Sequence, residues 1–298
     1  KENIIAFLFI LPPIVGFCIF TIGAMAFSFV YSFQDYKILT GESTWQGLKN
    51  YKDLFTHILY SKSFFTSILN TLVLLLSIPC SMALGLCLAG LLRMGEIKGS
   101  KVFQVLYYLP AVSSAVAMNI VWRYIFNNEF GIINLLIGKK IPWLSDDVLI
   151  KVAIIIKNSL NGMGTAMILY LAGMLGVPKD YYEASELDGA GKVKQFFKIT
   201  LPYISPTIQF LVVMGLISSF QYFTQAYVFA SVSQVGQSIT GGPQNSLLFY
   251  SMYLYMNGFS YMKMGYASAM AIVLFLIVLV VSFVAMYLME KRVTYDVE

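Results

Sequence analysis

Long apolar stretches dominate this sequence and limit what it can fold into. A helix needs about 20 apolar residues to cross the hydrocarbon core of a bilayer. The stretches of that length lie at about residues 4–30, 67–92, 102–126, 148–175, 203–231 and 267–289. The first is too long and too aromatic for a signal peptide. We therefore expect an all-α membrane protein with six transmembrane helices, forming one transmembrane domain over residues 1–298.

The composition agrees with a protein of the membrane and argues against several other classes. Apolar residues make up 58% of the chain and charged residues only 12%, whereas soluble domains carry about 25% charge. The Lys and Arg residues are scattered between the spans, so no basic face indicates a nucleic-acid partner. Cys18, Cys80 and Cys87 lie in apolar stretches without a CxxC spacing, and we expect them to pack, with no disulfide and no metal.

The distribution of basic residues favours one orientation of the spans: the inner and outer sides carry ten Lys and Arg each, but the inner segments are shorter, so their density of basic residues is higher. Basic residues are enriched in cytoplasmic segments, and Lys291-Arg292 directly follows the last span. We expect both termini to be cytoplasmic. The outer segments are then about 31–66, 127–147 and 232–266, and the inner loop between spans four and five is 176–202.

Two features of the spans carry packing predictions. Ser81, Gly85 and Ala89 recur every fourth residue, a small-residue stripe that lets a second helix approach closely. Lys151 and Lys157 lie in the fourth span, and we expect both to extend toward the outer membrane surface, as long basic side chains commonly do.

The inner loop 176–202 is a polar, glycine-containing island in the apolar sequence. Asp180 with Glu183 three residues later forms an Asp variant of a capping box, and Gly189 can end the helix that follows. A second amphipathic stretch runs from 193 to 199, so we expect two short helices at the inner surface.

Within this island, Gly191-Lys192 resembles the end of a phosphate-binding loop. Such a loop needs Gly five residues earlier and Ser or Thr after the Lys. This chain has Glu186 and Val193 at those positions. We therefore expect no nucleotide site here, and a solvated cytoplasmic loop remains the simple alternative reading of the island.

The same island resembles the EAA loop of the permease subunits of binding-protein-dependent ABC importers. The spacing from Glu183-Ala184-Ser185 to Gly189 and on to Leu201-Pro202 matches that loop, and 196–202 resembles its carbohydrate-uptake branch. Ser185 departs from the family, which usually has Ala there. The resemblance extends over almost the whole chain. Its other segments are 47–51, 70–71, 109–122, 131–134, 143–144, 240–243 and 265–269.

The resemblance implies a function, an assembly and a location. It implies one permease subunit of an ATP-driven importer of a carbohydrate, with an oligosaccharide expected, working by alternating access in the bacterial cytoplasmic membrane. Its partners would be a second homologous permease, a cytoplasmic ABC ATPase dimer, an extracytoplasmic sugar-binding protein and membrane lipid. ATP and Mg would be bound by the ATPase, with no cofactor in this chain and no catalysis by it.

The resemblance also implies two sets of functional residues. A cytoplasmic coupling helix between helices four and five would contact the ATPase, through Glu183, Ala184, Ser185, Asp188 and Gly189. Gapless alignment from the loop to the maltose-type member places sugar-contacting positions on Asn161, Gly162, Thr165, Gly215, Ser219, Gln221 and Tyr222. Polar side chains inside a span are functional candidates, although hydrogen bonds between helices would also explain them.

Two other classes of protein are alternatives to an importer permease. A secondary transporter driven by an ion gradient would carry inverted repeats and carboxylates within its spans, and the six stretches show no obvious mid-span Asp or Glu. A membrane enzyme would need a catalytic constellation. The single histidine, His57, which we expect to be a polar loop residue, leaves little from which to build one.

Overall fold

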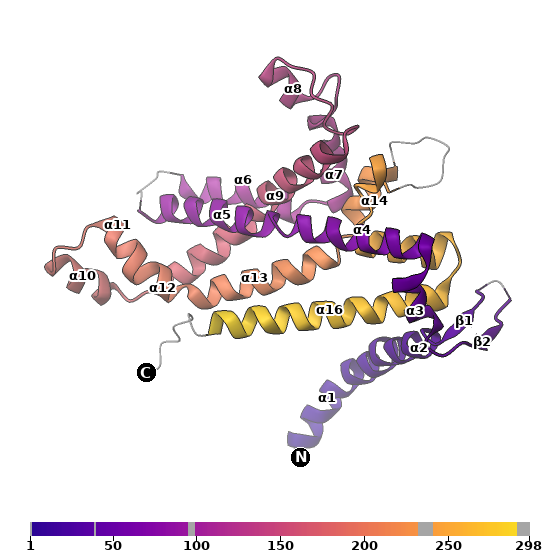
Figure 1. The fold of residues 1–298 in the computed structure, drawn as a ribbon. Coiled ribbons are helices and arrows are strands. Elements are labelled where there is room, and N and C mark those ends of the chain that lie inside the picture. Colours follow the sequence, from indigo (N-terminus) through magenta and orange to yellow (C-terminus); the bar gives the residue numbers. More distant parts are fainter. Residues whose placement is uncertain (1, 39, 95–98, 232–240, 291–298) are drawn as a thin grey trace. The chain divides into compact units, whose positions relative to one another are not determined.

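The computed structural model describes residues 2–38, 40–94, 99–231 and 241–290. In this part of the chain, almost all regular structure is helical, and one two-stranded sheet accompanies the helices (Figure 1). The chain divides into two compact units. The first contains residues 1–65 and 251–277, and the second contains residues 66–250 and 278–298. The all-α prediction is confirmed.

The first unit begins with a long apolar helix. It comprises α1 (Glu2–Gly16), a π-helical segment (Phe17–Gly23) and α2 (Ala24–Tyr31), joined without a break in helical backbone. Strands β1 (Gln34–Tyr36) and β2 (Ser43–Trp45) follow and pair antiparallel, with Gln34 opposite Trp45. The remaining elements are α3 (Lys49–Thr56), the start of α4 (Ile58–Leu74), most of α15 (Tyr250–Tyr255), a π-helical segment (Met256–Ser260) and the first half of α16 (Met264–Glu290).

Side chains of the first unit fasten its sheet to its helices. Asn50 donates two hydrogen bonds, to the carbonyl oxygens of Ser32 at 2.9 Å and Gln34 at 3.0 Å. Gly265 at the start of α16 lies against the same strand, and a Cβ atom there would come within 1.8 Å of the Gln34 carbonyl oxygen. Any larger residue at 265 would push the strand away from α16.

The second unit is a helical body built around α9 (Asp147–Leu175). Asp146 caps α9 by accepting hydrogen bonds at 2.9 Å from the amides of Val148 and Leu149, which satisfies two free donors of its first turn. The other helices of this unit are the end of α4, α5 (Ser77–Met94), α6 (Ser100–Val112), α7 (Ala115–Ile125), α8 (Ile132–Ile137), α10 (Lys179–Leu187), α11 (Lys192–Gln195), α12 (Leu201–Tyr203), α13 (Ser205–Phe220), α14 (Thr224–Ser231) and the end of α16.

Small residues let α5 and α6 approach α9 closely. A Cβ atom on Gly85 of α5 would lie 2.6 Å from the Cβ of Ala166, and one on Gly162 of α9 would lie 3.0 Å from that of Ser81. Ala89 is buried in the same interface. The predicted packing role of the stripe is confirmed. On a second face of α9, a Cβ at Gly164 would come within 2.1 Å of the Tyr107 carbonyl oxygen.

The predicted spans correspond to helices, but two of them are bent. Four helical stretches are long and apolar enough to cross a membrane: Phe9–Tyr31, Tyr60–Arg93, Asp147–Leu175 and Met264–Glu290. The third predicted span instead forms α6 and α7, which meet at 101°. The fifth bends by 61° before Ser205 and breaks again after Phe220. If each bent pair counts as one span, the described residues hold up to six.

Candidate functional site

A cavity of about 540 Å³ lies between α5, α9 and α13 of the second unit. Its wall is mostly apolar, with a small number of polar side chains from α5, α9, α13, the segment between α13 and α14, and the start of α14. These polar side chains belong to Ser77, Ser81, Asn158, Thr165, Ser218, Ser219, Tyr222 and Gln225. No acidic residue is among the described residues of the wall. Hydroxyl and amide groups on an apolar wall suit a hydroxyl-rich ligand better than a metal ion.

The cavity brings together five of the seven residues predicted to contact sugar. Gly162, Thr165, Gly215, Ser219 and Tyr222 line it. The two glycines also permit close helix packing, since a Cβ at Gly215 would lie 3.1 Å from Ile78.

The other two predicted residues lie elsewhere. Asn161 accepts a hydrogen bond from the Trp122 indole at 3.0 Å, which ties α9 to α7. Gln221 is exposed and lies outside the cavity wall. The predicted contacts of Asn161 and Gln221 therefore have no support from the geometry of this chain.

Lys157 does not extend to the surface, so that expectation was wrong. Its side chain is 2% exposed. The ammonium group donates a hydrogen bond of 3.4 Å to the hydroxyl of Tyr222 and lies 5.5 Å from the centre of its ring. The Tyr222 hydroxyl in turn donates to Oδ1 of Asn158 at 3.3 Å. Tyr222 and Asn158 both line the cavity, so Lys157 stands directly behind its wall.

The inner loop contains the two predicted short helices, with one change at the first helix start. α10 runs from Lys179 to Leu187 and has Pro178 at its N-terminal boundary. Asp180 lies inside the helix, and no side chain caps it, so the predicted capping box was wrong. The helix already begins at Lys179, so Asp180 is its second residue and does not occupy the position from which a side chain caps the first turn. Gly189 has φ +72° and ends the helix in the left-handed region as predicted.

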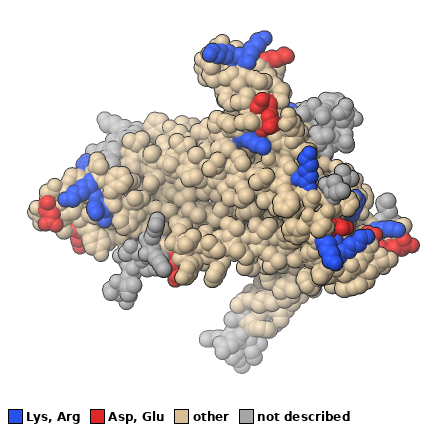
Figure 2. Space-filling view, viewed as in Figure 1, with Lys and Arg blue, Asp and Glu red and all other residues tan. Residues whose placement is uncertain are grey.

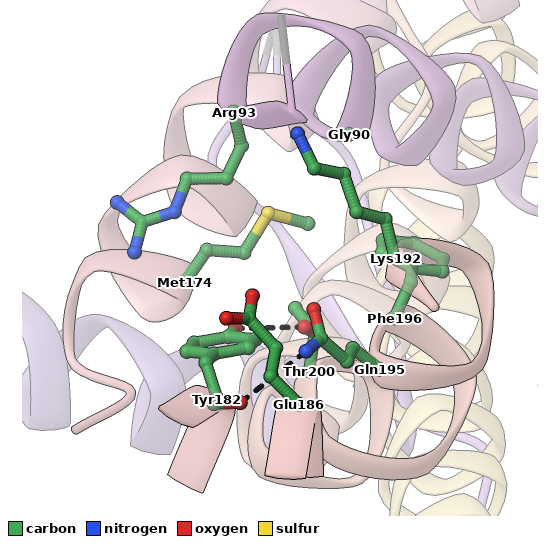
Figure 3. A pocket seen from close by; sticks show the side chains of 9 residues that line it. All are labelled: Gly90, Arg93, Met174, Tyr182, Glu186, Lys192, Gln195, Phe196 and Thr200. Atoms are coloured by element: carbon green, nitrogen blue, oxygen red, sulfur yellow. Dashed lines mark hydrogen bonds between the residues drawn. The ribbon is translucent and has the colours of Figure 1, made fainter. Parts of the chain in front are cut away.

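Hydrogen bonds fasten α10 to the segment that leads into α13. Gln195 is 6% exposed, and its side-chain amide donates to Oγ of Ser185 at 2.9 Å and to the carbonyl oxygen of Tyr182 at 3.3 Å. The hydroxyls of Tyr182 and Thr200 share a hydrogen bond of 2.8 Å. Figure 3 shows the side chains of Tyr182, Gln195 and Thr200 close together in the lining of a pocket. We call Tyr182, Ser185, Gln195 and Thr200 the α10 bracket.

The pocket above the α10 bracket is polar and carries charge of both signs. It has a volume of about 490 Å³ and is lined by the ends of α5 and α9 together with α10 and α11. Arg93 of α5, Lys192 of α11 and Glu186 of α10 all line it, and Figure 3 shows the Glu186 carboxylate below the two basic side chains. Glu183, Ala184, Asp188 and Gly189 are exposed on the rest of the loop, so the predicted coupling residues form an accessible polar surface, apart from the half-buried Ser185.

Charged side chains of the second unit gather at the ends of its helices. Figure 2 shows Lys, Arg, Asp and Glu over α10 and α11 and again near α8, with an uncharged face over α5, α6 and α9 between them. A body with two charged ends and an apolar middle matches the two surfaces and the hydrocarbon core of a bilayer.

The sequence alone did not identify Tyr182, Gln195, Thr200 or Lys157 as functional candidates. Three of them are polar residues of ordinary type in an amphipathic loop. Only the fold places Gln195, on α11, against Ser185, on α10. A basic residue within a span indicates a functional candidate, so Lys157 could have been identified. The direction of its side chain, however, depends on the position of Tyr222 in the fold.

Comparisons with known proteins identify the family to which this chain is similar. The family described as a binding-protein-dependent transport system inner membrane component matches residues 81–295. The probable ABC transporter permease protein YesP of Bacillus subtilis (strain 168) is 38% identical over 285 residues, which cover 93% of this chain and 88% of YesP. The arabinooligosaccharides transport system permease protein AraP of the same organism is 30% identical, covering 95% of this chain and 87% of AraP.

A solved structure shares the fold. A bacterial ABC transporter involved in the import of the acidic polysaccharide alginate matches with a TM-score of 0.80 and 23% identity, covering 98% of this chain and 96% of the matched chain. Permease subunits of this family are not enzymes, because ATP is hydrolysed by separate subunits. The family match therefore excludes the alternative of a secondary transporter driven by an ion gradient. The chain belongs to the family of binding-protein-dependent transport system inner membrane components, the permease subunits of ABC importers.

Proposed function

We propose that this chain is one of two homologous permease subunits of an ATP-driven importer that takes up an oligosaccharide delivered by an extracytoplasmic binding protein. The cavity between α5, α9 and α13 carries the proposal for the substrate. Its hydroxyl and amide groups suit sugar hydroxyls. Relatives named as permeases for arabinooligosaccharides, lactose and maltodextrin support a carbohydrate.

In this proposal α10 is the coupling helix that docks on a cytoplasmic ATPase dimer. Glu183 would accept hydrogen bonds from ATPase donors, Ala184 and Ser185 would permit close approach, and Asp188 with Gly189 would turn the chain away. The ATPase pair would bind ATP and Mg. Closure of the pair would move α10, and through the α10 bracket the base of α13, which would switch the cavity between the two sides of the membrane.

The Glu183→Ala variant tests this role. A hydrogen bond to a charged group contributes about 1.5–3 kcal/mol, so we expect sugar uptake and sugar-stimulated ATP hydrolysis to fall about tenfold or more. Both are measured in proteoliposomes that contain the complete transporter. The matched control is Glu129→Ala, an exposed carboxylate of the loop before α8, which should behave as wild type. Wild-type uptake by the Glu183→Ala variant would refute the coupling role of this residue.

The proposed substrate class has its own test. A panel of labelled oligosaccharides, including arabinotriose, lactose and maltotriose, is offered to the purified binding protein and then to the complete transporter. We expect saturable ATP-dependent uptake of at least one oligosaccharide. If no carbohydrate binds and an amino acid or peptide is transported instead, the substrate proposal is wrong even though the family assignment stands.

A further inference from the structure

The Lys157 ammonium group is buried without a carboxylate in the part of the chain that the structure describes. Its side chain is 2% exposed, and its hydrogen-bond partner is the neutral hydroxyl of Tyr222. The one ion pair among the described residues joins Lys37 and Glu42, near the sheet of the first unit. A charge inside a membrane span is costly unless an opposite charge balances it. The positive charge of Lys157 would therefore be stabilised by a negative charge, and the described residues of this chain place none beside it.

The hydrogen bonds of Lys157 also fix which groups face the cavity. An ammonium group can only donate hydrogen bonds, so the Tyr222 hydroxyl accepts from Lys157 and gives its own proton to Oδ1 of Asn158. This leaves the NH₂ group of Asn158, which lines the cavity, free to donate. The wall near Lys157 thus offers hydrogen-bond donors backed by a positive charge.

A donor-lined wall with a positive charge behind it favours an anionic ligand. The described wall contains no acidic side chain, so a carboxylate in the cavity would meet no repulsion from it. In a medium of low dielectric constant, the attraction of that carboxylate to Lys157 is only weakly screened. A neutral sugar would gain hydrogen bonds there but would leave the buried charge unbalanced.

On the basis of the proposed function, we propose that the cavity takes an oligosaccharide bearing a carboxylate, such as one built from uronic acid residues, and that Lys157 determines this specificity. The Asn158 amide donates to the substrate, and Lys157 supplies the balancing charge through the Tyr222 contact. The cavity alternates between facing one side of the membrane and the other with this anionic sugar inside.

The test compares charged and neutral sugars of the same shape in the complete transporter reconstituted in proteoliposomes. The probes are labelled tri-galacturonate and tri-mannuronate, each beside the trimer in which the carboxylates are reduced to hydroxymethyl groups. For wild type we expect at least one uronate to enter at least tenfold faster than its neutral counterpart. Lys157→Met, which keeps an unbranched side chain but removes the charge, should lower uronate uptake at least tenfold and change neutral uptake less than twofold.

Two further variants separate charge from structure. Lys157→Arg keeps the positive charge and should retain uronate uptake within about threefold of wild type. Lys151→Met removes a basic residue of the same helix that lies outside the cavity wall and should leave the uronate preference unchanged.

The outcomes distinguish this inference from the proposed function. If wild type takes up only neutral oligosaccharides, the inference is wrong and the proposed function stands. If Lys157→Met lowers the uptake of charged and neutral sugars equally, Lys157 has a structural role, such as pairing with a carboxylate of the partner permease, and the inference is again wrong. If no oligosaccharide of either kind is transported, the proposed function itself fails.

Discussion

At the scale of single residues, asparagine side chains hold the irregular segments of this protein in place. Asn50, Asn70 and Asn134 each donate to at least two backbone carbonyl oxygens of a neighbouring segment. Buried carbonyl groups outside helices need donors, and one amide NH₂ group satisfies two of them. All three residues fall in the segments that carry the family resemblance, which gives those segments a physical explanation.

Gly164 yields a stability prediction at this scale. A Cβ atom there would come within 2.1 Å of the Tyr107 carbonyl oxygen, a backbone atom that cannot move alone. We expect Gly164→Ala to force α6 away from α9 and to destabilise the second unit by about 1–3 kcal/mol, the usual cost of overpacking. The measurement is the thermal melting temperature of the purified protein in detergent.

Gly90→Ala is the matched control for this prediction. The added methyl group would lie 3.6 Å from the ring of Phe196, an ordinary contact. Its melting temperature should stay close to that of wild type. Equal melting temperatures for Gly164→Ala and Gly90→Ala would show that α6 and α9 do not pack as described.

Residue types predicted packing better than they predicted side-chain direction. Ser81, Gly85 and Ala89 could be read from sequence because small residues at helical spacing have one common use. The direction of the Lys157 side chain was predicted wrongly because a lysine can extend either way along a helix. Its observed direction depends on a hydrogen bond to Tyr222, which lies 65 positions away in the sequence.

At the scale of elements, breaks in helices separate the observed spans from the predicted ones. Ser113 and Ser114 have extended backbone between α6 and α7, and the two helices meet at 101°. Hydropathy averages over a window of residues and does not register such a break, because the residues on both sides are apolar. Pro110 lies inside α6, and the break comes after Val112 rather than at the proline.

The α10 bracket gives a prediction at this scale. Gln195→Ala removes both hydrogen bonds from α11 to α10, and Tyr182→Phe removes the bond to Thr200. Each bond contributes about 1 kcal/mol, so α10 should move more independently of α13. We expect the number of ATP molecules hydrolysed per sugar transported to rise in each single variant, and the rise to be larger in the double variant.

The control for the α10 bracket is Lys194→Ala, an exposed neighbour of Gln195. It should leave the ratio of ATP to sugar unchanged. Gln195→Glu, which keeps an acceptor but loses the amide donor, should behave like Gln195→Ala. If the ratio stays at the wild-type value in the double variant while uptake falls, the α10 bracket only stabilises the loop and does not transmit movement.

At the scale of the whole molecule, the proposed orientation places both termini and α10 on the cytoplasmic side. Charged groups gather over α10–α11 and again near α8 (Figure 2), and the proposed orientation assigns these two groups to different sides of the membrane. We predict that Glu129→Cys, in the loop before α8, reacts with a membrane-impermeant maleimide in intact cells. Lys101→Cys, in α6 near the inner end of α5, should react only after the membrane is opened.

This labelling experiment needs a background without native cysteine. Cys18, Cys80 and Cys87 are exposed on the isolated chain and would be replaced by alanine first. Labelling of Lys101→Cys but not Glu129→Cys in intact cells would reverse the proposed orientation. The basic residues alone could not settle this, because they divide evenly between the two sides in the sequence.

Whole-molecule function was more accessible from sequence than the details of the site. Glu183, Gly189 and Leu201-Pro202 have a spacing specific enough to indicate the family, which the comparisons then confirmed. The cavity was harder to predict, since Asn161 and Gln221 align with sugar-contacting positions but lie outside its wall. An alignment transfers positions along a helix, whereas the bends around α13 decide which side chains face inward.

The bond between Trp122 and Asn161 provides a natural optical reporter. The protein has three tryptophans, and the Trp122 indole donates to Asn161, which precedes the cavity residue Gly162 on α9. With Trp45 and Trp143 replaced by phenylalanine, the remaining emission would come from this one ring. The emission maximum of Trp122 would shift whenever α7 and α9 separate, because the indole would then exchange its amide partner for water. The transport cycle could therefore be followed in real time without an attached dye.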